Sequence, residues 1–128
     1  MKRRPAFNFV IEELEPLSPV VRPMFGCHSV YVGEKIVLFL RDVNKKPMEN
    51  GVWVATTPEE YASLSKEFAS MTPFNKPEPG KSPWFLLAPN APDFEEAALK
   101  ACEMILNGDP RIGRVTKPTK INRKRRSE

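Results

Sequence analysis

The sequence predicts an α+β fold in which a mainly antiparallel sheet of about four strands packs against helices, in the order α-β-β-β-α-β-α. Apolar residues recur at helical spacing in three segments, and β-prone runs that follow one another over short connections lie between them. Prolines and glycines separate these segments. The 128 residues are 41% hydrophobic and 28% charged, which is typical of one globular domain.

The first part of the chain predicts a helix followed by a hairpin. Over residues 7–15 the apolar side chains have the i, i+3, i+4, i+7 spacing of one buried stripe: Phe7, Val10, Ile11 and Leu14. Pro16 ends this helix because its ring would clash with the preceding turn. Residues 22–32 and 36–42 predict two strands joined by a turn at Gly33. The second strand is apolar on both faces, so we expect it inside the sheet.

A third strand and a second helix are expected next. Residues 51–55 form the strand, and the helix begins with a capping box made by Thr57 and Glu60. Pro58 suits the first helical position, where no amide donor is needed. The residues expected to face the core from this helix are Tyr61, Leu64 and Phe68.

The last strand and helix follow an irregular segment. Residues 72–83 contain four prolines, so we expect no regular element there. Residues 84–87 predict a strand. Asp93 and Glu96 predict a second capping box, for a helix that ends near Asn107.

Basic residues gather at the two ends of the chain, whose formal net charge is +4. We expect a basic arm over residues 1–6, the domain over 7–108 and a basic tail over 109–128. Lysine and arginine release counterions from phosphates, so the tail is a candidate for weak, electrostatic contact with nucleic acid. The candidate contact residues are Lys117, Lys120, Arg123, Lys124, Arg125 and Arg126. The alternative is a solvated tail that only raises solubility, and no aromatic residue follows Phe94 to stack on a base.

The residue patterns predict no enzyme activity, metal or cofactor. Cys27 and His28 are neighbours on a predicted strand, so their side chains should point to opposite faces. One histidine and two cysteines are too few for a zinc site. The sequence has no phosphate-binding loop or dinucleotide fingerprint.

The cysteine content and the lack of a signal peptide or an apolar run of about 20 residues predict a cytoplasmic protein without a membrane span.

Three stretches of the chain carry a family resemblance. They are residues 8–17, a strand and helix at 84–89 and 94–98, and an Arg-x-Met-Phe-Gly motif made by Arg22, Met24, Phe25 and Gly26. Together they resemble the TfoX N-terminal domain family, which is related to YjbR-like proteins. The resemblance implies a small α+β domain, a regulatory role and no established chemistry, and YjbR-like proteins are often described as DNA-binding. Family members commonly carry a second glycine where this chain has Cys27.

The motif has a structural and a functional interpretation. Packing would place Phe25 in the core, allow close backbone approach at Gly26 and pair Arg22 with a carboxylate or a helix end. The alternative is a cleft for a ligand or partner beside the first strand.

The expected function is a non-enzymatic regulatory or binding module that contacts nucleic acid through its basic tail. The alternative is a protein–protein interaction domain, a homodimer whose tail only aids solubility. Three aromatic residues near the ends of elements suggest this alternative: Trp53, Phe74 and Trp84.

Overall fold

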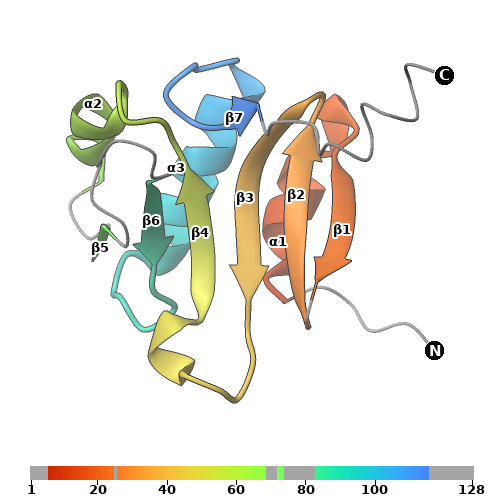
Figure 1. Cartoon of the computed structure of the whole chain (residues 1–128), viewed down its shortest axis with the longest axis vertical. Coiled ribbons are helices and arrows are strands. Elements are labelled where there is room, and N and C mark those ends of the chain that lie inside the picture. Colours follow the sequence, from red (N-terminus) through yellow and green to blue (C-terminus); the bar gives the residue numbers. More distant parts are fainter. Residues whose placement is uncertain (1–5, 25, 69–71, 74–82, 116–128) are drawn as a thin grey trace, which may run out of the picture.

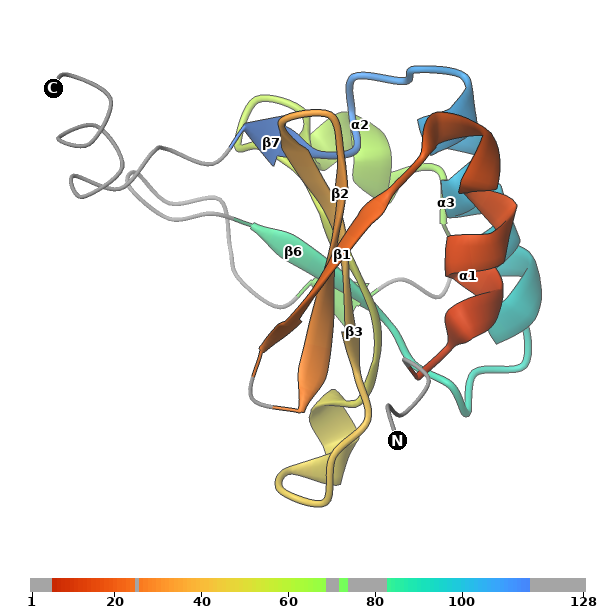
Figure 2. The ribbon, with the colours of Figure 1, turned by 90° about the vertical axis from the view of Figure 1, so that its right-hand side faces the viewer.

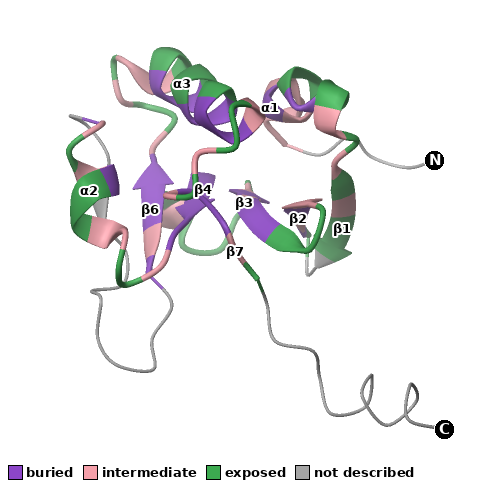
Figure 3. Ribbon diagram, turned by 90° about the horizontal axis from the view of Figure 1, so that it is seen from above, coloured by how far each residue is buried: buried purple, intermediate pink, exposed green. Residues whose placement is uncertain are grey.

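The chain folds into two layers, a sheet and a pair of helices that covers one of its faces, while the third helix lies to one side of the sheet (Figures 1 and 3). The computed structural model describes residues 6–24, 26–68, 72–73 and 83–115. The helices are α1 (Asn8–Glu13), α2 (Tyr61–Ser65) and α3 (Phe94–Leu106). The strands are β1 (Val20–Met24), β2 (Cys27–Val32), β3 (Lys35–Arg41), β4 (Gly51–Ala55), β5 (Thr72–Pro73), β6 (Trp84–Leu87) and β7 (Arg114–Val115). Two short 3-10 helices, Glu15–Leu17 and Pro47–Glu49, complete the set.

The α+β class and the antiparallel sheet are confirmed, but the described residues form a sheet of seven strands where about four were expected. The strand order is β1-β2-β3-β4-β6-β5, and β7 pairs with the start of β3. The largest difference lies in the run 22–32, which folds back on itself as β1 and β2. Gly26 makes this possible because it holds a φ of +82°, which side chains with a Cβ rarely adopt.

Of the two predicted capping boxes, the first forms its hydrogen bond outside a helix and the second forms none. The Thr57 hydroxyl accepts a hydrogen bond from the Glu60 amide at 3.3 Å, but it does so in a turn, and α2 begins only at Tyr61. Asp93 does lie at the N-cap of α3, yet its side chain caps no amide and its Oδ1 atom is buried without a hydrogen-bond partner. The second capping box is therefore wrong. The reason is the Asp93 backbone, whose φ of −105° and ψ of 23° differ from the extended form of a capping residue.

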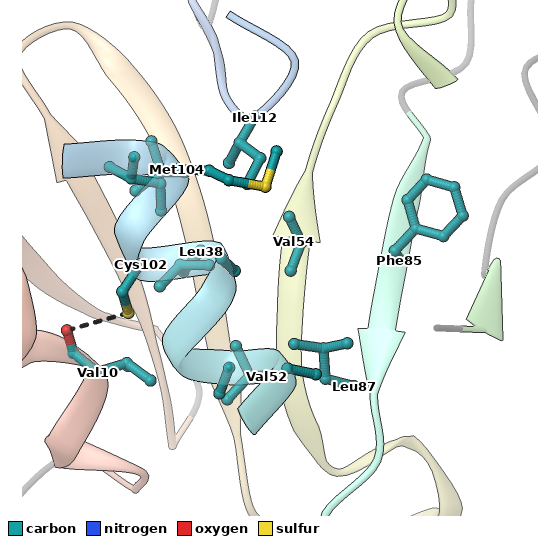
Figure 4. Close-up of a cluster of buried hydrophobic side chains, with 14 of the residues drawn as sticks. Val10, Leu38, Val52, Val54, Phe85, Leu87, Cys102, Met104 and Ile112 are labelled. Atoms are coloured by element: carbon teal, nitrogen blue, oxygen red, sulfur yellow. Dashed lines mark hydrogen bonds between the residues drawn. The ribbon is translucent and has the colours of Figure 1, made fainter. Parts of the chain in front are cut away.

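The core lies between the sheet and the pair α1 and α3, which pack side by side on one face (Figure 2). Strand pairing aligns a fully buried row across four strands: Val30, Leu38, Val54 and Phe85. Figure 4 shows the part of this core beneath α3. The thiol of Cys102 in α3 donates to the Val10 carbonyl oxygen of α1 at 3.7 Å, which ties the two helices together. We call this the inner face of the sheet.

Candidate nucleic-acid interface

The opposite side of the sheet, its outer face, carries an aromatic and basic surface. Strand residues alternate between the two faces, so the neighbours of the buried row point away from α1 and α3. Register aligns them as a second row across the same four strands and β1: Arg22, Ser29, Phe39, Trp53 and Leu86. Of these, Ser29, Trp53 and Leu86 are buried, Phe39 is partly exposed and Arg22 is exposed.

Three rings form a cluster on this outer face. Phe39 packs edge-to-face on Trp53 and on Trp84, with ring centroids 6.0 and 6.1 Å apart. Trp53 and Trp84 pack in the same way at 6.1 Å. Such contacts stabilise an aromatic cluster beyond simple burial, so these rings hold one another in place.

An arginine accompanies an aromatic ring at each side of this cluster. The Arg114 guanidinium lies 4.5 Å from the centroid of the Trp84 ring, and its Nη1 donates to the carbonyl oxygens of Thr56 and Pro83. The Arg22 guanidinium lies 5.5 Å from the centroid of the Tyr31 ring. Burial lowers the pKa of Arg114, but an arginine remains charged at neutral pH. Both pairs are cation–π contacts, which leave a positive charge on the outer face.

Charge is divided between the two layers. In the part of the chain that the structure describes, the seven strands contain no aspartate or glutamate, and they carry four cations: Arg22, Lys35, Arg41 and Arg114. The helices α1 and α3 carry five glutamates against Lys100 alone. The described part of the fold therefore has an acidic helical layer and a basic sheet. The strand predicted over residues 36–42 includes Asp42, so the lack of acids follows only from the observed end of β3 at Arg41, and which strand residues share a face depends on register.

The residues of the Arg-x-Met-Phe-Gly motif surround the turn from β1 to β2. Among the described residues, Arg22 contacts the Tyr31 ring, whereas the structural interpretation expected a carboxylate or a helix end. Gly26 provides the turn, and a Cβ atom there would lie 3.3 Å from Cγ1 of Val43. Phe25 and the side chain of Met24 lie outside the described residues. The described half of the motif thus serves strand pairing and the turn.

The structure separates Cys27 and His28, as the sequence predicted. They are successive residues of β2 and point to opposite faces, with His28 opposite Leu40 of β3. Burial raises the pKa of the Cys27 thiol and raises that of Cys102 to about 12. Both thiols are therefore neutral at physiological pH, which disfavours them as nucleophiles or metal ligands. Within the described residues, no group of three or more histidine, cysteine or acidic side chains could hold a metal ion.

The fold continues past the expected boundary at residue 108. Ile112 is only 2% exposed and belongs to the core. The Gly113 amide donates to the Ala55 carbonyl oxygen at 2.7 Å, and β7 pairs Arg114 and Val115 with the start of β3. The basic tail therefore begins after Val115. All six candidate contact residues of the tail, from Lys117 to Arg126, lie outside the described residues.

A network of ion pairs ties this last segment to α3 and to the turn that follows α2. Arg111 binds Asp109 through Nη2 at 2.7 Å and Glu67 through Nη1 at 2.7 Å. Lys100 of α3 binds the other oxygen of Glu67 at 3.2 Å. Hydrogen bonds from Arg111 hold the pKa of both carboxyl groups below their ordinary values.

Acid should therefore weaken this network. A carboxyl group whose pKa is lowered by folding stabilises the folded state above its ordinary pKa, and that stabilisation is lost as the pH falls through the folded value. We expect the melting temperature to fall between about pH 5 and pH 3, and to fall less steeply in the Glu67→Gln variant. Thermal unfolding at a series of pH values checks this. An equally steep fall in the variant would show that Glu67 does not contribute.

Comparison of the chain with models of protein families, with curated proteins and with solved structures gives no match. Among the described residues, no helix is both long enough and apolar enough to cross a membrane.

Proposed function

We propose that this protein is a non-enzymatic binding module with a regulatory role, and that it contacts nucleic acid through its basic tail. The observation that carries the proposal is the division of charge between the layers. The tail follows β7, which belongs to the basic sheet, while the acidic residues of α1 and α3 lie on the other layer. A polyanion such as nucleic acid is attracted to the basic sheet and tail and is repelled by the acidic helices α1 and α3.

The tail supplies the charge that such binding needs. After Val115 the sequence has six basic residues against Glu128 alone. Each phosphate that a basic side chain neutralises releases counterions, so the logarithm of the binding constant falls with the logarithm of the salt concentration by about 0.9 per phosphate on a duplex. About six contacts would reduce the affinity on the order of a thousandfold between 50 and 200 mM salt.

A salt titration on two proteins tests the proposal. Fluorescence anisotropy of a labelled 20-base-pair duplex is measured with the full chain and with a chain that ends after Val115. We expect the full chain to bind with a steep salt dependence and the shortened chain to lose most of the affinity. A variant with glutamine at the six basic tail positions should behave like the shortened chain. Salt-insensitive binding, or equal binding by both proteins, would contradict the proposal.

The resemblance to the TfoX N-terminal domain family remains a prediction. The α+β class agrees with what the resemblance implies, and the glycine of the motif has a positive φ at a hairpin turn. These features support the proposed family and with it a regulatory role. The lack of a matching family model leaves the proposal to experiment.

The alternative, a homodimer with a merely solubilising tail, has less support. The strand β1 lies at one edge of the sheet, where a second copy could add a strand, but Pro23 removes an amide donor from it and Pro19 precedes it. Among the described residues, the exposed large apolar side chains lie on separate elements: Val20, Met48, Leu99 and Val115. Light scattering measures the oligomeric state, and the anisotropy titration measures duplex binding. A dimer that binds no duplex would favour the alternative.

A further inference from the structure

We infer that the outer face of the sheet is a platform for single-stranded nucleic acid, on which bases stack against the exposed parts of Tyr31, Phe39 and Trp84. This inference rests on the proposed function and adds the class of nucleic acid and the place where it binds. Single-strand binding surfaces combine aromatic rings, on which bases stack, with positive charge that follows the phosphates. Both occur together on this face and on neighbouring strands.

The geometry fits stacking from one side. Tyr31, Phe39 and Trp84 are all partly exposed, and they come from three different strands. Phe39 and Trp84 hold each other at 6.1 Å, so the rings of the cluster are positioned before any strand binds. Rings that are already fixed lose little conformational entropy on binding, which favours affinity.

The arginines add the charge. Arg22 is exposed, so its guanidinium can bind a phosphate next to a base that lies on Tyr31. Arg114 is fixed by two carbonyl oxygens and adds a positive charge beside Trp84.

A second copy of this chain is the other partner that could bind the outer face, and charge disfavours it. Two such faces would bring the arginines of both copies together, and the strands offer no carboxylate to neutralise them. A nucleic acid strand supplies the missing negative charge.

Within a duplex the bases are stacked on one another, so only a single strand can use the aromatic rings. The rings and arginines contact bases and phosphates, which DNA and RNA share, so both should bind within a few-fold of each other.

Intrinsic fluorescence tests the inference without any substitution. The chain has two tryptophans, and both Trp53 and Trp84 lie on the outer face. We expect a dT15 oligonucleotide and a U15 oligonucleotide to quench this fluorescence, because a stacked base quenches an indole, whereas a 15-base-pair duplex bound through the tail should not. Saturating dT15 without any quenching would overturn the inference.

Two sets of variants separate the platform from the tail. We expect Tyr31→Leu combined with Phe39→Leu to weaken dT15 binding on the order of tenfold for each ring lost, and to leave duplex binding within twofold. Leu99→Ala on the outside of α3 is the matched control and should change neither. Circular dichroism shows whether each variant is folded.

The outcomes distinguish the two proposals. If removal of the tail abolishes binding of both probes and the ring variants change neither, the platform is wrong and the proposed function stands. If the ring variants weaken dT15 and duplex equally, the platform is also wrong. If the full chain binds neither probe at 50 mM salt, the proposed function fails and the inference with it.

Discussion

Removing residues 109–128 should destabilise the fold by several kcal/mol, whereas removing residues 116–128 should leave its stability almost unchanged. The difference lies in residues 109–115, which the sequence assigned to the tail. They place Ile112 in the core, and loss of such a side chain costs about 2–5 kcal/mol. The same deletion removes the hydrogen bond from Gly113 to Ala55 and the pairing of β7 with β3.

Urea unfolding of three proteins measures this effect: the full chain, the chain that ends after Gly108 and the chain that ends after Val115. Ile112→Ala in the full chain is the control, and it should account for much of the loss. Equal midpoints for the two shortened chains would contradict the boundary after Val115. The comparison also serves as a control for the binding experiments. A tail deletion that begins too early would abolish binding because it unfolds the protein.

The second large effect is expected at Gly51, where alanine should destabilise the protein by more than about 3 kcal/mol. Gly51 begins β4 with a φ of +146°, and an added Cβ would overlap the carbonyl oxygen of Leu87 in the paired strand β6. Backbone cannot move aside as a flexible side chain can. The strands β4 and β6 would therefore have to separate at this point, which lies next to the buried Val52 and Leu87.

Gly33 provides the matched control for this substitution. It also has a positive φ, of +61°, but nothing lies within 4 Å of the position of an added Cβ. Gly33→Ala should therefore cost only the backbone strain, about 1–2 kcal/mol. Chemical denaturation of both variants compares the two costs. A loss at Gly51 no larger than that at Gly33 would show that β4 and β6 adjust without penalty.

The predicted site could be recovered from the sequence only in part. The basic character of the tail is local in sequence, so it was identified without a structure, although its start was placed too early. Arg111 and Arg114 look like tail residues because they are basic and follow a proline and a glycine. In the fold Arg111 binds Asp109 and Glu67. Arg114 lies over the Trp84 ring and donates to the carbonyl oxygen of Thr56, which is 58 residues away. No local pattern reveals such partners.

The sequence by itself determined the class of the fold, its three helices and the strands β3, β4 and β6, with β3 inside the sheet. These follow from apolar periodicity and from prolines and glycines, which act over a few residues. Tertiary structure alone decided which strand residues share a face, and so brought Arg22, Phe39 and Trp84 to one surface. It also decided that the chain crosses back to β3 as β7 before the tail begins. The physical reason is that strand register and the burial of Ile112 depend on contacts between distant segments, whose energies no short stretch of sequence contains.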